Sequence, residues 1–332
     1  MEQYLGAYNG KNILITGGAG CIGSNLTRAL INAKAAKVIV LDDLSAAEKW
    51  NIPIAPDVVF IKGSVLDEEV LKRAFSQGLD FVFHLAAHFA NQNSVDNPET
   101  DLMVNGLGIL KVLEYSRLAG VGKVVFASSG CSVYGSEAPL PLKEDFISLH
   151  LDTPYQITKL LGELYCNYFY NYYGLPVAIA RYFNVYGPGE IPGAYRNVTP
   201  LFIWRSLHNI PLRMLGTGNE TRDFTFVEDI VEGTLRCGVV PEAVGQAFNL
   251  ASETETKVID LAKMVNEITG NTKEIEFGSR RDWDKIIRRR ASIEKARKVL
   301  GYEPKVKLKE GIKRTYDWIV ENRARIEADA RF

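Results

Sequence analysis

The sequence has little of what marks several large classes of protein. Its four cysteines, in a chain of 332 residues, lie far apart and form no CxxC or Cys/His spacing, which excludes a disulfide framework and a zinc site. The formal net charge of -1 gives no reason to expect a nucleic acid or an anionic membrane as partner. The first residues do not form a signal peptide, and no apolar run is long enough to span a membrane. We therefore expect a cytoplasmic globular protein without a metal.

Short, apolar, β-rich runs alternate with amphipathic stretches of helical length from residue 12 onward. Such nearly uninterrupted runs are typical of strands buried on both faces, as in a parallel sheet covered by helices. The pattern predicts an α/β fold with a doubly wound parallel sheet of the Rossmann type. The expected strands are 12–16, 37–42, 58–63, 80–86, 123–128 and 176–181, and the expected helices lie near 22–33, 67–76, 98–119 and 155–173.

The alternation ends after residue 182, in a segment rich in Gly, Pro and Asn. Shorter and mixed elements follow, which indicates a second, smaller, mixed α/β lobe. We expect the Rossmann domain to span 1–182 plus about 224–252, and the second lobe to span about 183–223 plus 253–332.

Three glycines follow the first expected strand and open a helix. Gly17, Gly20 and Gly23 have the spacing G-x-x-G-x-x-G in TGGAGCIG. Glycines at these places allow a tight turn, close approach of a pyrophosphate, and packing of helix on strand. The helix N-terminus then offers N–H groups and a positive dipole to the phosphates. The motif predicts dinucleotide binding, and Cys21 within it is interpreted as a small packing residue.

Asp42 ends the second expected strand. An acidic side chain there can accept hydrogen bonds from a ribose 2′-OH and repels a 2′-phosphate, which favours NAD over NADP. The alternative is that Asp42 or Asp43 only caps a turn.

Tyr155 and Lys159 form a Y-x-x-x-K pair on an expected helix. Positions i and i+4 share a helix face, so the ammonium can lie beside the phenol. A nearby cation favours the phenolate and lowers the pKa of a tyrosine, which is about 10 when free. The pair therefore predicts a catalytic tyrosine tuned by a lysine.

With these motifs the sequence resembles the extended short-chain dehydrogenase/reductases, and among them the nucleotide-sugar epimerases. The resemblance covers nearly the whole chain and is closest to the UDP-glucose and UDP-N-acetylglucosamine 4-epimerases. It is carried by TGGAGCIG, HLAA (84–87), SSGCSVYG (128–135), YQITK (155–159), RYFNVYGPG (181–189) and TRDFTFVEDI (221–230).

The resemblance implies a retained NAD and a nucleotide-diphosphate sugar as substrate. Tyr155 would take the proton from the sugar O4 while C4 gives up a hydride, and the 4-keto sugar would turn and take the hydride back. Lys159 would hold the nicotinamide ribose. The further cofactor contacts that the resemblance implies are Cys21, Ile22, Ser64, Val65, Leu85, Ala86, Ala87, Asn105, Ser128 and Tyr182.

The second lobe would hold the nucleotide diphosphate. Asn184, Asn197 and Arg222 match family positions near the phosphates. In GSRRDWDKIIRRR (278–290) Arg281 is the first choice for a further phosphate contact and Asp284 for a ribose contact, with Arg288 to Arg290 as rivals. The resemblance also implies a homodimer through the helices near 98–119 and 155–173.

One position departs from the 4-epimerases, which carry Ser or Thr four residues before the Tyr of VYG. Here that position, expected beside the substrate, is Gly130. In a 4-epimerase that has lost this hydroxyl, serine should be tolerated there, provided that Gly130 does not need a positive φ. Ser129 and Cys131 flank it and are both candidates for a catalytic role. Cys131 leaves open a C3 or C5 epimerisation, and its alternative is a small residue packed under the sheet. A 4-keto reductase and a non-catalytic NAD or nucleotide-sugar binding protein are further alternatives.

Overall fold

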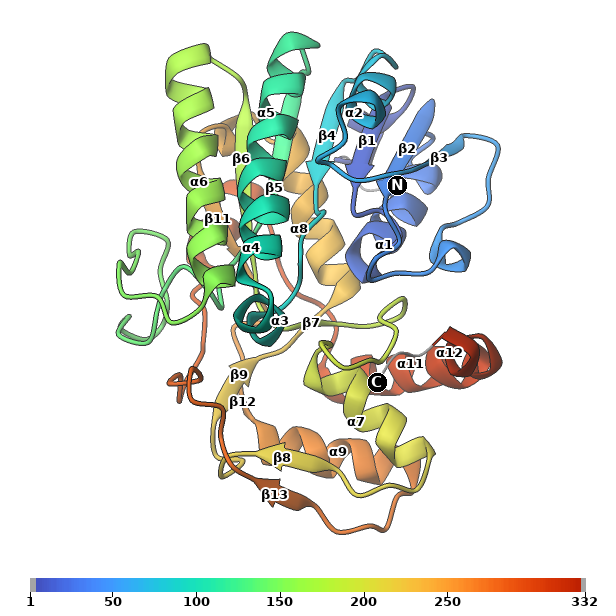
Figure 1. Ribbon diagram of the computed structural model, residues 1–332, viewed down its shortest axis with the longest axis vertical. Helices are drawn as coiled ribbons and strands as arrows, with labels where there is room; N and C mark the ends of the chain where they lie inside the picture. The colour runs from blue at the N-terminus through green and yellow to red at the C-terminus, as the bar shows by residue number, and fades with distance from the viewer. Residues whose placement is uncertain (1–3, 330–332) are drawn as a thin grey trace.

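A seven-stranded parallel sheet forms the larger of two lobes in the computed structural model, which describes residues 4–329 (Figure 1). In the sheet, β2 and β3 follow on one side of β1, and β4, β5, β6 and β11 follow on its other side. The direction in which strands are added to the sheet therefore reverses between β1 and β4. Such a switch point is where ligands bind in open α/β sheets. The strands are β1 (Asn12–Thr16), β2 (Lys37–Asp42), β3 (Val58–Lys62), β4 (Phe81–His84), β5 (Lys123–Ser129), β6 (Val177–Tyr182) and β11 (Ala247–Leu250).

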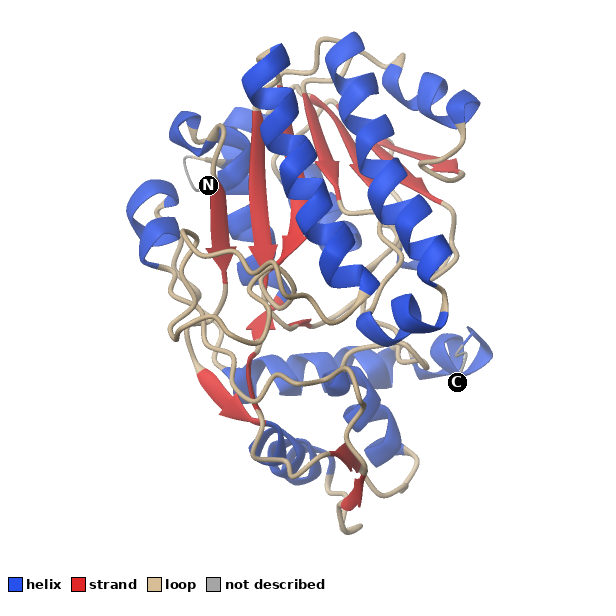
Figure 2. Ribbon diagram, turned by 60° about the vertical axis from the view of Figure 1, so that its left-hand side comes forward, coloured by secondary structure: helices blue, strands red, loops and turns tan. Residues whose placement is uncertain are grey.

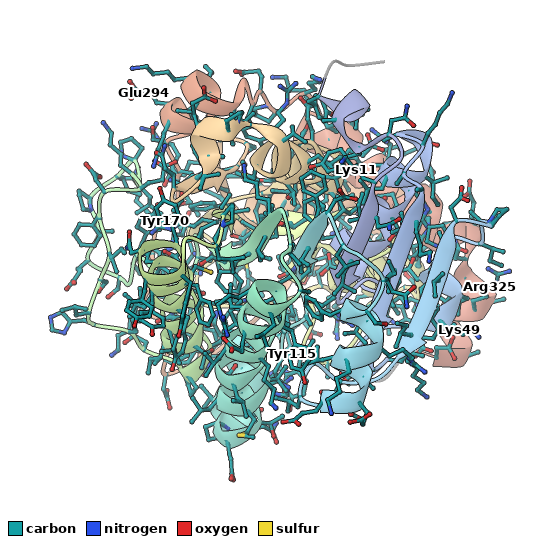
Figure 3. All side chains as sticks on the ribbon, turned by 90° about the horizontal axis from the view of Figure 1, so that it is seen from above. Lys11, Lys49, Tyr115, Tyr170, Glu294 and Arg325 are labelled. Atoms are coloured by element: carbon teal, nitrogen blue, oxygen red, sulfur yellow. The ribbon has the colours of Figure 1, made fainter. Side chains whose placement is uncertain are left out.

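Helices cover both faces of this sheet, which confirms the doubly wound fold (Figures 2 and 3). Successive strand residues point to opposite faces, so Ile13 and Ile15 join one buried apolar cluster and Leu14 joins the other. One face carries α1 (Cys21–Asn32) and α8 (Val227–Val239), and the other carries α2 (Glu68–Phe75), α5 (Gly108–Leu118) and α6 (Pro154–Tyr173).

The expected helix near 98–119 is built from three pieces. α4 (Pro98–Asp101) is followed by η3 (Leu102–Leu107), a stretch of π-helix, and then by α5. η3 and α5 both contact α6. The remaining short helices of the first lobe are η1 (Leu5–Tyr8), η2 (Lys49–Asn51), α3 (Asn91–Asp96) and η4 (Pro241–Ala243).

The second lobe lies below the carboxyl ends of the strands in Figure 1. Three two-stranded pairs organise it: β7 with β10, β8 with β13, and β9 with β12. Its strands are β7 (Val185–Tyr186), β8 (Arg213–Leu215), β9 (Thr221–Asp223), β10 (Thr225–Phe226), β12 (Glu255–Lys257) and β13 (Glu276–Gly278), and its helices are α7 (Val198–Leu207), α9 (Val258–Thr269), α11 (Leu308–Glu321) and α12 (Arg323–Asp329).

One segment expected in the second lobe packs on the first. α10 (Glu294–Leu300) contacts α8 and β11. Ala291, just before it, bridges to Leu142 of the first lobe. Across residues 4–329, no helix combines the length and the apolar character that crossing a membrane requires.

Candidate functional site

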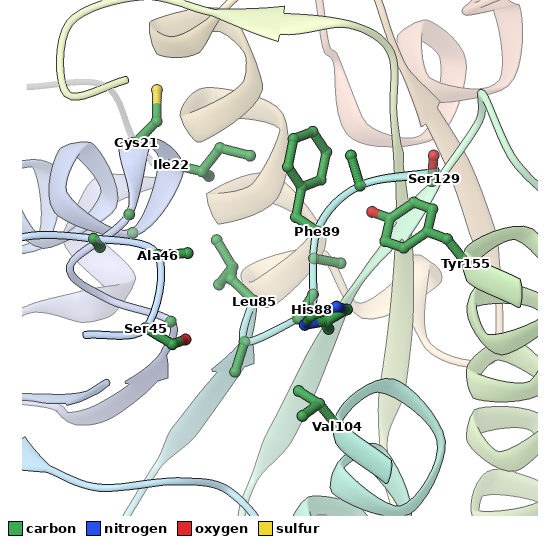
Figure 4. Close-up of a pocket in the computed structure, with 18 of the residues that line it drawn as sticks. Cys21, Ile22, Ser45, Ala46, Leu85, His88, Phe89, Val104, Ser129 and Tyr155 are labelled. Carbon is green, nitrogen blue, oxygen red and sulfur yellow. The ribbon is translucent and has the colours of Figure 1, made fainter. Parts of the chain in front are cut away.

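A cavity of about 520 Å³ lies where the two lobes meet at the carboxyl ends of the strands. Cys21 and Ile22, which open α1, lie at one end of it (Figure 4). Ser129 and Tyr155 lie at the other end, with Leu85 and Phe89 between (Figure 4). The cavity therefore joins the glycine loop to the Tyr155 region in one continuous space.

The glycine loop has no room for larger residues. Gly17 has φ +71, and a Cβ on it would lie 2.6 Å from the backbone nitrogen of Ala86. A Cβ on Gly23 would overlap the backbone of Gly17 and Gly18. No side chain caps the N-terminus of α1 at Gly20, so this end of the helix offers its N–H groups to the cavity.

Asp42 lines the cavity and also forms a hydrogen bond with the glycine loop. Its carboxylate accepts hydrogen bonds from the backbone N–H groups of Ala19 (3.0 Å) and Leu44 (2.9 Å). Burial raises the pKa of Asp42, and these two hydrogen bonds oppose the shift. The loop-capping alternative thus describes a real contact, and the contact with a ribose remains a prediction.

Tyr155 and Lys159 lie together as expected, but their electrostatics differ from the prediction. Burial, followed by the charges of Asp101 and Cys131, raises the pKa of Tyr155 instead of lowering it. Burial also lowers the pKa of Lys159 to about 8, against the charge of Asp101. The Lys159 ammonium donates to the carbonyl of Ala127 (2.8 Å) and lies 5.6 Å from the centre of the Tyr155 ring.

Ser128 and Ser129 have different surroundings. The Ser128 hydroxyl donates to Glu163 (2.5 Å), whose other oxygen pairs with the buried Arg181 at 2.7 Å. Ser128 lines the cavity, and its role as a cofactor contact stays a prediction, although its hydroxyl is used inside the core. Ser129 lines the cavity beside Tyr155, and so it is the hydroxyl available at this end.

Gly130 is a glycine because of Phe183. A Cβ at position 130 would overlap the ring atoms Cε2 and Cζ of Phe183, which is fully buried. This overturns the expectation that serine is tolerated there. Gly130 does not line the cavity, in contrast to its neighbours Ser129 and Cys131.

Cys131 is half-buried in the cavity wall. Its Sγ donates to the side-chain oxygen of Asn184 (3.2 Å). Burial raises the pKa of Cys131, and the charge of Arg289 only partly opposes this. The environment thus keeps the thiol protonated.

Most of the other expected contacts line the cavity, and Asn105 does not. Asn105 accepts a hydrogen bond from the His88 backbone (2.7 Å) and so positions the cavity wall from behind. Tyr182 lines the cavity while its hydroxyl bonds to Thr234 (2.8 Å). Lining residues that were expected are Gly17, Gly20, Cys21, Ile22, Gly23, Asp42, Ser64, Val65, Leu85, Ala86, Ala87, Asn184 and Asn197.

The expected phosphate-binding residues of the second lobe lie in a neighbouring cluster. Arg222 and Arg280 both approach Asp284, at 3.4 and 3.5 Å. Arg289 is buried and donates to the carbonyls of Cys131 and Gly135.

Arg281, the first choice made from the sequence for a further phosphate contact, lies apart from the ion pairs of Asp284, and its phosphate contact stays a prediction. It is exposed and lies over the ring of Trp283, with its guanidinium carbon 5.7 Å from the ring centre. Arg280 and Arg289 approach the cluster in its place.

Several cavity residues were not predicted from the sequence. They come from the loop 45–47 after β2, the segment 88–91 after β4, and the loop that carries Glu190 and Arg196. These segments have no motif and enter the site only through tertiary packing. Residues 45–47 and 88–91 follow strands of a parallel sheet, and loops at that end of a sheet form binding sites. This position is the feature of the sequence from which their place in the cavity could have been predicted.

The residues at the glycine-loop end fit NAD. A close-packed turn of glycines, the N–H groups of an uncapped helix N-terminus and a carboxylate after β2 are the groups that bind a pyrophosphate and an adenosine ribose. A larger residue at position 17 would close this cradle.

Comparison with known proteins agrees with this geometry. Residues 13–251 match the NAD dependent epimerase/dehydratase family. A UDP-glucose 4-epimerase of Mycolicibacterium smegmatis is 36% identical over 92% of this chain and 97% of its own. An epimerase structure from Methanothermobacter thermautotrophicus is 56% identical, with a TM-score of 0.98 over 99% of this chain and 98% of that one.

A third relative was solved with ligands. The structure of the Bordetella bronchiseptica enzyme WbmF in complex with NAD+ and UDP is 38% identical, with a TM-score of 0.85 over 97% of this chain and 96% of that one. The resemblance to the extended short-chain dehydrogenase/reductases is confirmed, and with it the enzyme class and the NAD cofactor. The chain belongs to the NAD-dependent epimerase/dehydratase family.

Proposed function

We propose that the protein inverts C4 of a nucleotide-diphosphate sugar through a transient 4-keto sugar, with NAD retained between turnovers. The observation that carries this is the single cavity that joins the glycine loop to Ser129, Tyr155 and Lys159. The similarity to a named UDP-glucose 4-epimerase and to a structure solved with UDP supports a UDP-sugar as the substrate.

Tyr155 is the acid and base of this reaction. Bound NAD would supply the hydride acceptor and a positive charge that favours a phenolate. Tyr155 takes the O4 proton and later returns it, and Ser129 is placed at the same end of the cavity to bridge the phenol and O4. The Lys159 ammonium, 5.6 Å from the centre of the Tyr155 ring, supplies a positive charge that favours the phenolate.

The arginine cluster of the second lobe binds the diphosphate. Arg222 and Arg280 both approach one carboxylate, Asp284, whose charge also acts on Arg289, so the cluster has an excess of positive charge. Guanidinium groups suit the oxygens of a diphosphate.

Cys131 is a poor acid or base for C3 or C5 epimerisation. A thiolate is the reactive form, and burial keeps this thiol protonated. A 4-keto reductase differs from the proposed epimerase in consuming added NADH, which makes the two experimentally distinct.

A homodimer through α5 and α6 completes the proposal. Large apolar side chains are exposed along one face of α6 at spacings of seven, four and four residues, at Ile157, Leu164, Tyr168 and Tyr172. Leu102 and Met103 of η3, which contacts α6, are exposed as well. A contiguous apolar face of this kind is typical of a protein–protein interface.

The test is incubation with UDP-, GDP- and dTDP-sugars in the absence of added cofactor, with C4 inversion followed by NMR. The wild-type protein should give both epimers of at least one sugar, and Tyr155→Phe should be slower by at least ~10²-fold with its NAD content unchanged. Turnover only when NADH is added, or an unimpaired Tyr155→Phe variant, would contradict the proposal.

A further inference from the structure

Arg196 is a cation at the cavity whose guanidinium forms no hydrogen bond or ion pair with the residues that the structure describes. It lines the main cavity and also a second hollow of about 320 Å³, which shares Ala46 and Phe89 with the first. The mechanism described above makes no use of it.

The chain on both sides of Arg196 is held in place. The Tyr195 hydroxyl donates to Asp96 of α3 (3.1 Å). The Asn197 amide donates to the carbonyl of Val185 (3.1 Å) and to Glu190 (2.9 Å). These contacts fix the backbone of Arg196 between the lobes, whereas its guanidinium can bind a ligand.

The charged side chains around the cavity indicate which residue can bind an anionic group near the glycine loop. The described lining residues include three carboxyl groups, on Asp42, Asp43 and Glu190, and only two Lys or Arg side chains, Lys159 and Arg196. Lys159 is at the Tyr155 end, bonded to the Ala127 carbonyl. Arg196 is therefore the single lining cation available near the glycine loop, where a dinucleotide brings two negative charges.

The influence of Arg196 falls on the glycine-loop end. Burial raises the pKa values of Asp42, Cys21 and Glu190, and the charge of Arg196 opposes the shift in each of the three. Arg222 and Asp284 in the phosphate cluster of the second lobe do not line this cavity. Asn184 and Asn197, which match family positions near the substrate phosphates, line the same cavity, so the electrostatic reach of Arg196 to the glycine loop is what favours the cofactor over the nucleotide sugar.

We propose that Arg196 binds the pyrophosphate of NAD, opposite the N-terminus of α1, and so ties the second lobe to the cofactor. The planar fork of a guanidinium matches two phosphate oxygens. The proposal rests on the cofactor of the family and is independent of which sugar is turned over.

The experiment follows release of NAD from the protein as purified. Arg196→Gln removes the charge, Arg196→Lys keeps the charge without the fork, and Arg73→Gln on the exposed surface of α2 is the matched control for net charge. Exchange of bound NAD for added NADH is read by NADH fluorescence, and the Kd for UDP is measured by calorimetry.

Arg196→Gln should release NAD about 10- to 100-fold faster, because a hydrogen bond to a charged group contributes about 1.5–3 kcal/mol and such losses appear mainly in dissociation. Arg196→Lys should be intermediate, and Arg73→Gln and the Kd for UDP should be unchanged. Unchanged NAD release in both Arg196 variants, or a weaker affinity for UDP with normal NAD release, would overturn the assignment. If Arg196→Gln fails to fold, the lysine variant decides, since it keeps the charged stem.

Discussion

At position 130 one neighbouring aromatic ring determines which residue type fits. The position lacks the hydroxyl that the 4-epimerases carry there, and the ring of Phe183 occupies the place of any side chain. The neighbouring Ser129 lines the cavity beside Tyr155. The catalytic hydroxyl of the proposed reaction is therefore one residue earlier in this chain.

Gly130→Ser should destabilise the protein by about 1–3 kcal/mol, the usual cost of overpacking a core. Urea unfolding measures this. In a background of Phe183→Ala the same change should cost much less, because the clash is gone. An equal cost in both backgrounds would mean that Phe183 is not the reason for the glycine.

Glu190 is a buried carboxyl group whose second oxygen has no hydrogen-bond partner among the described residues. Burial raises its pKa to about 7, although the charge of Arg196 and the hydrogen bond from Asn197 oppose this. Cys21, whose own pKa burial raises, also faces it. The folded protein therefore holds a proton that the unfolded chain loses near pH 4.5.

Because the folded pKa is the higher one, the stability contributed by Glu190 is complete below about pH 4.5 and decreases as the pH rises to about 7. Each pKa unit corresponds to about 1.4 kcal/mol. Glu190→Gln keeps an oxygen for Asn197 and removes the titration, so its stability should fall less between pH 5 and pH 8. Asp223, with a pKa raised by burial to about 6, affects both proteins equally. Parallel stability curves for variant and wild type would contradict the assignment.

At the scale of elements, β1 and α1 show what could be predicted from sequence. The apolar run 12–16 and the glycines after it place strand, turn and helix without any knowledge of the rest of the chain. The Tyr155–Lys159 pair was equally local, since both residues lie on one helix. The π-helical η3 and the loops at 45–47 and 191–196 have no such pattern, because distant packing determines them.

The exposed apolar face of α6 predicts a dimer interface, which a single substitution can test. Leu164 is 54% exposed there, and Leu164→Arg should convert a dimer to a monomer because a charge cannot be buried unpaired in the interface. Phe277→Arg on β13, at a residue that is 59% exposed, is the matched control and should leave the assembly unchanged. Light scattering coupled to size-exclusion chromatography gives the masses. A wild-type monomer, or a dimer that survives Leu164→Arg, would show that this face is not the interface.

At the scale of the whole molecule, the candidate site lies where the two lobes meet, and both lobes contribute residues to it. The sequence alone predicted the sheet, the glycine loop and the Tyr155–Lys159 pair, each of which depends on residues close together in the chain. It could not predict that Ser128 bonds to Glu163, that Arg281 lies outside the arginine cluster, or that α10 returns to the first lobe. Those outcomes depend on contacts between segments far apart in sequence.

The central claim is that one hydrogen leaves C4 and returns to the same carbon. The most direct measurement uses a UDP-sugar that carries deuterium at C4, without added cofactor, and locates the label in the product by NMR. The account predicts a C4 epimer that keeps its deuterium at C4, with no hydrogen exchanged between solvent and the ring. Loss of the label from C4, or inversion at C3 or C5 in place of C4, would contradict it.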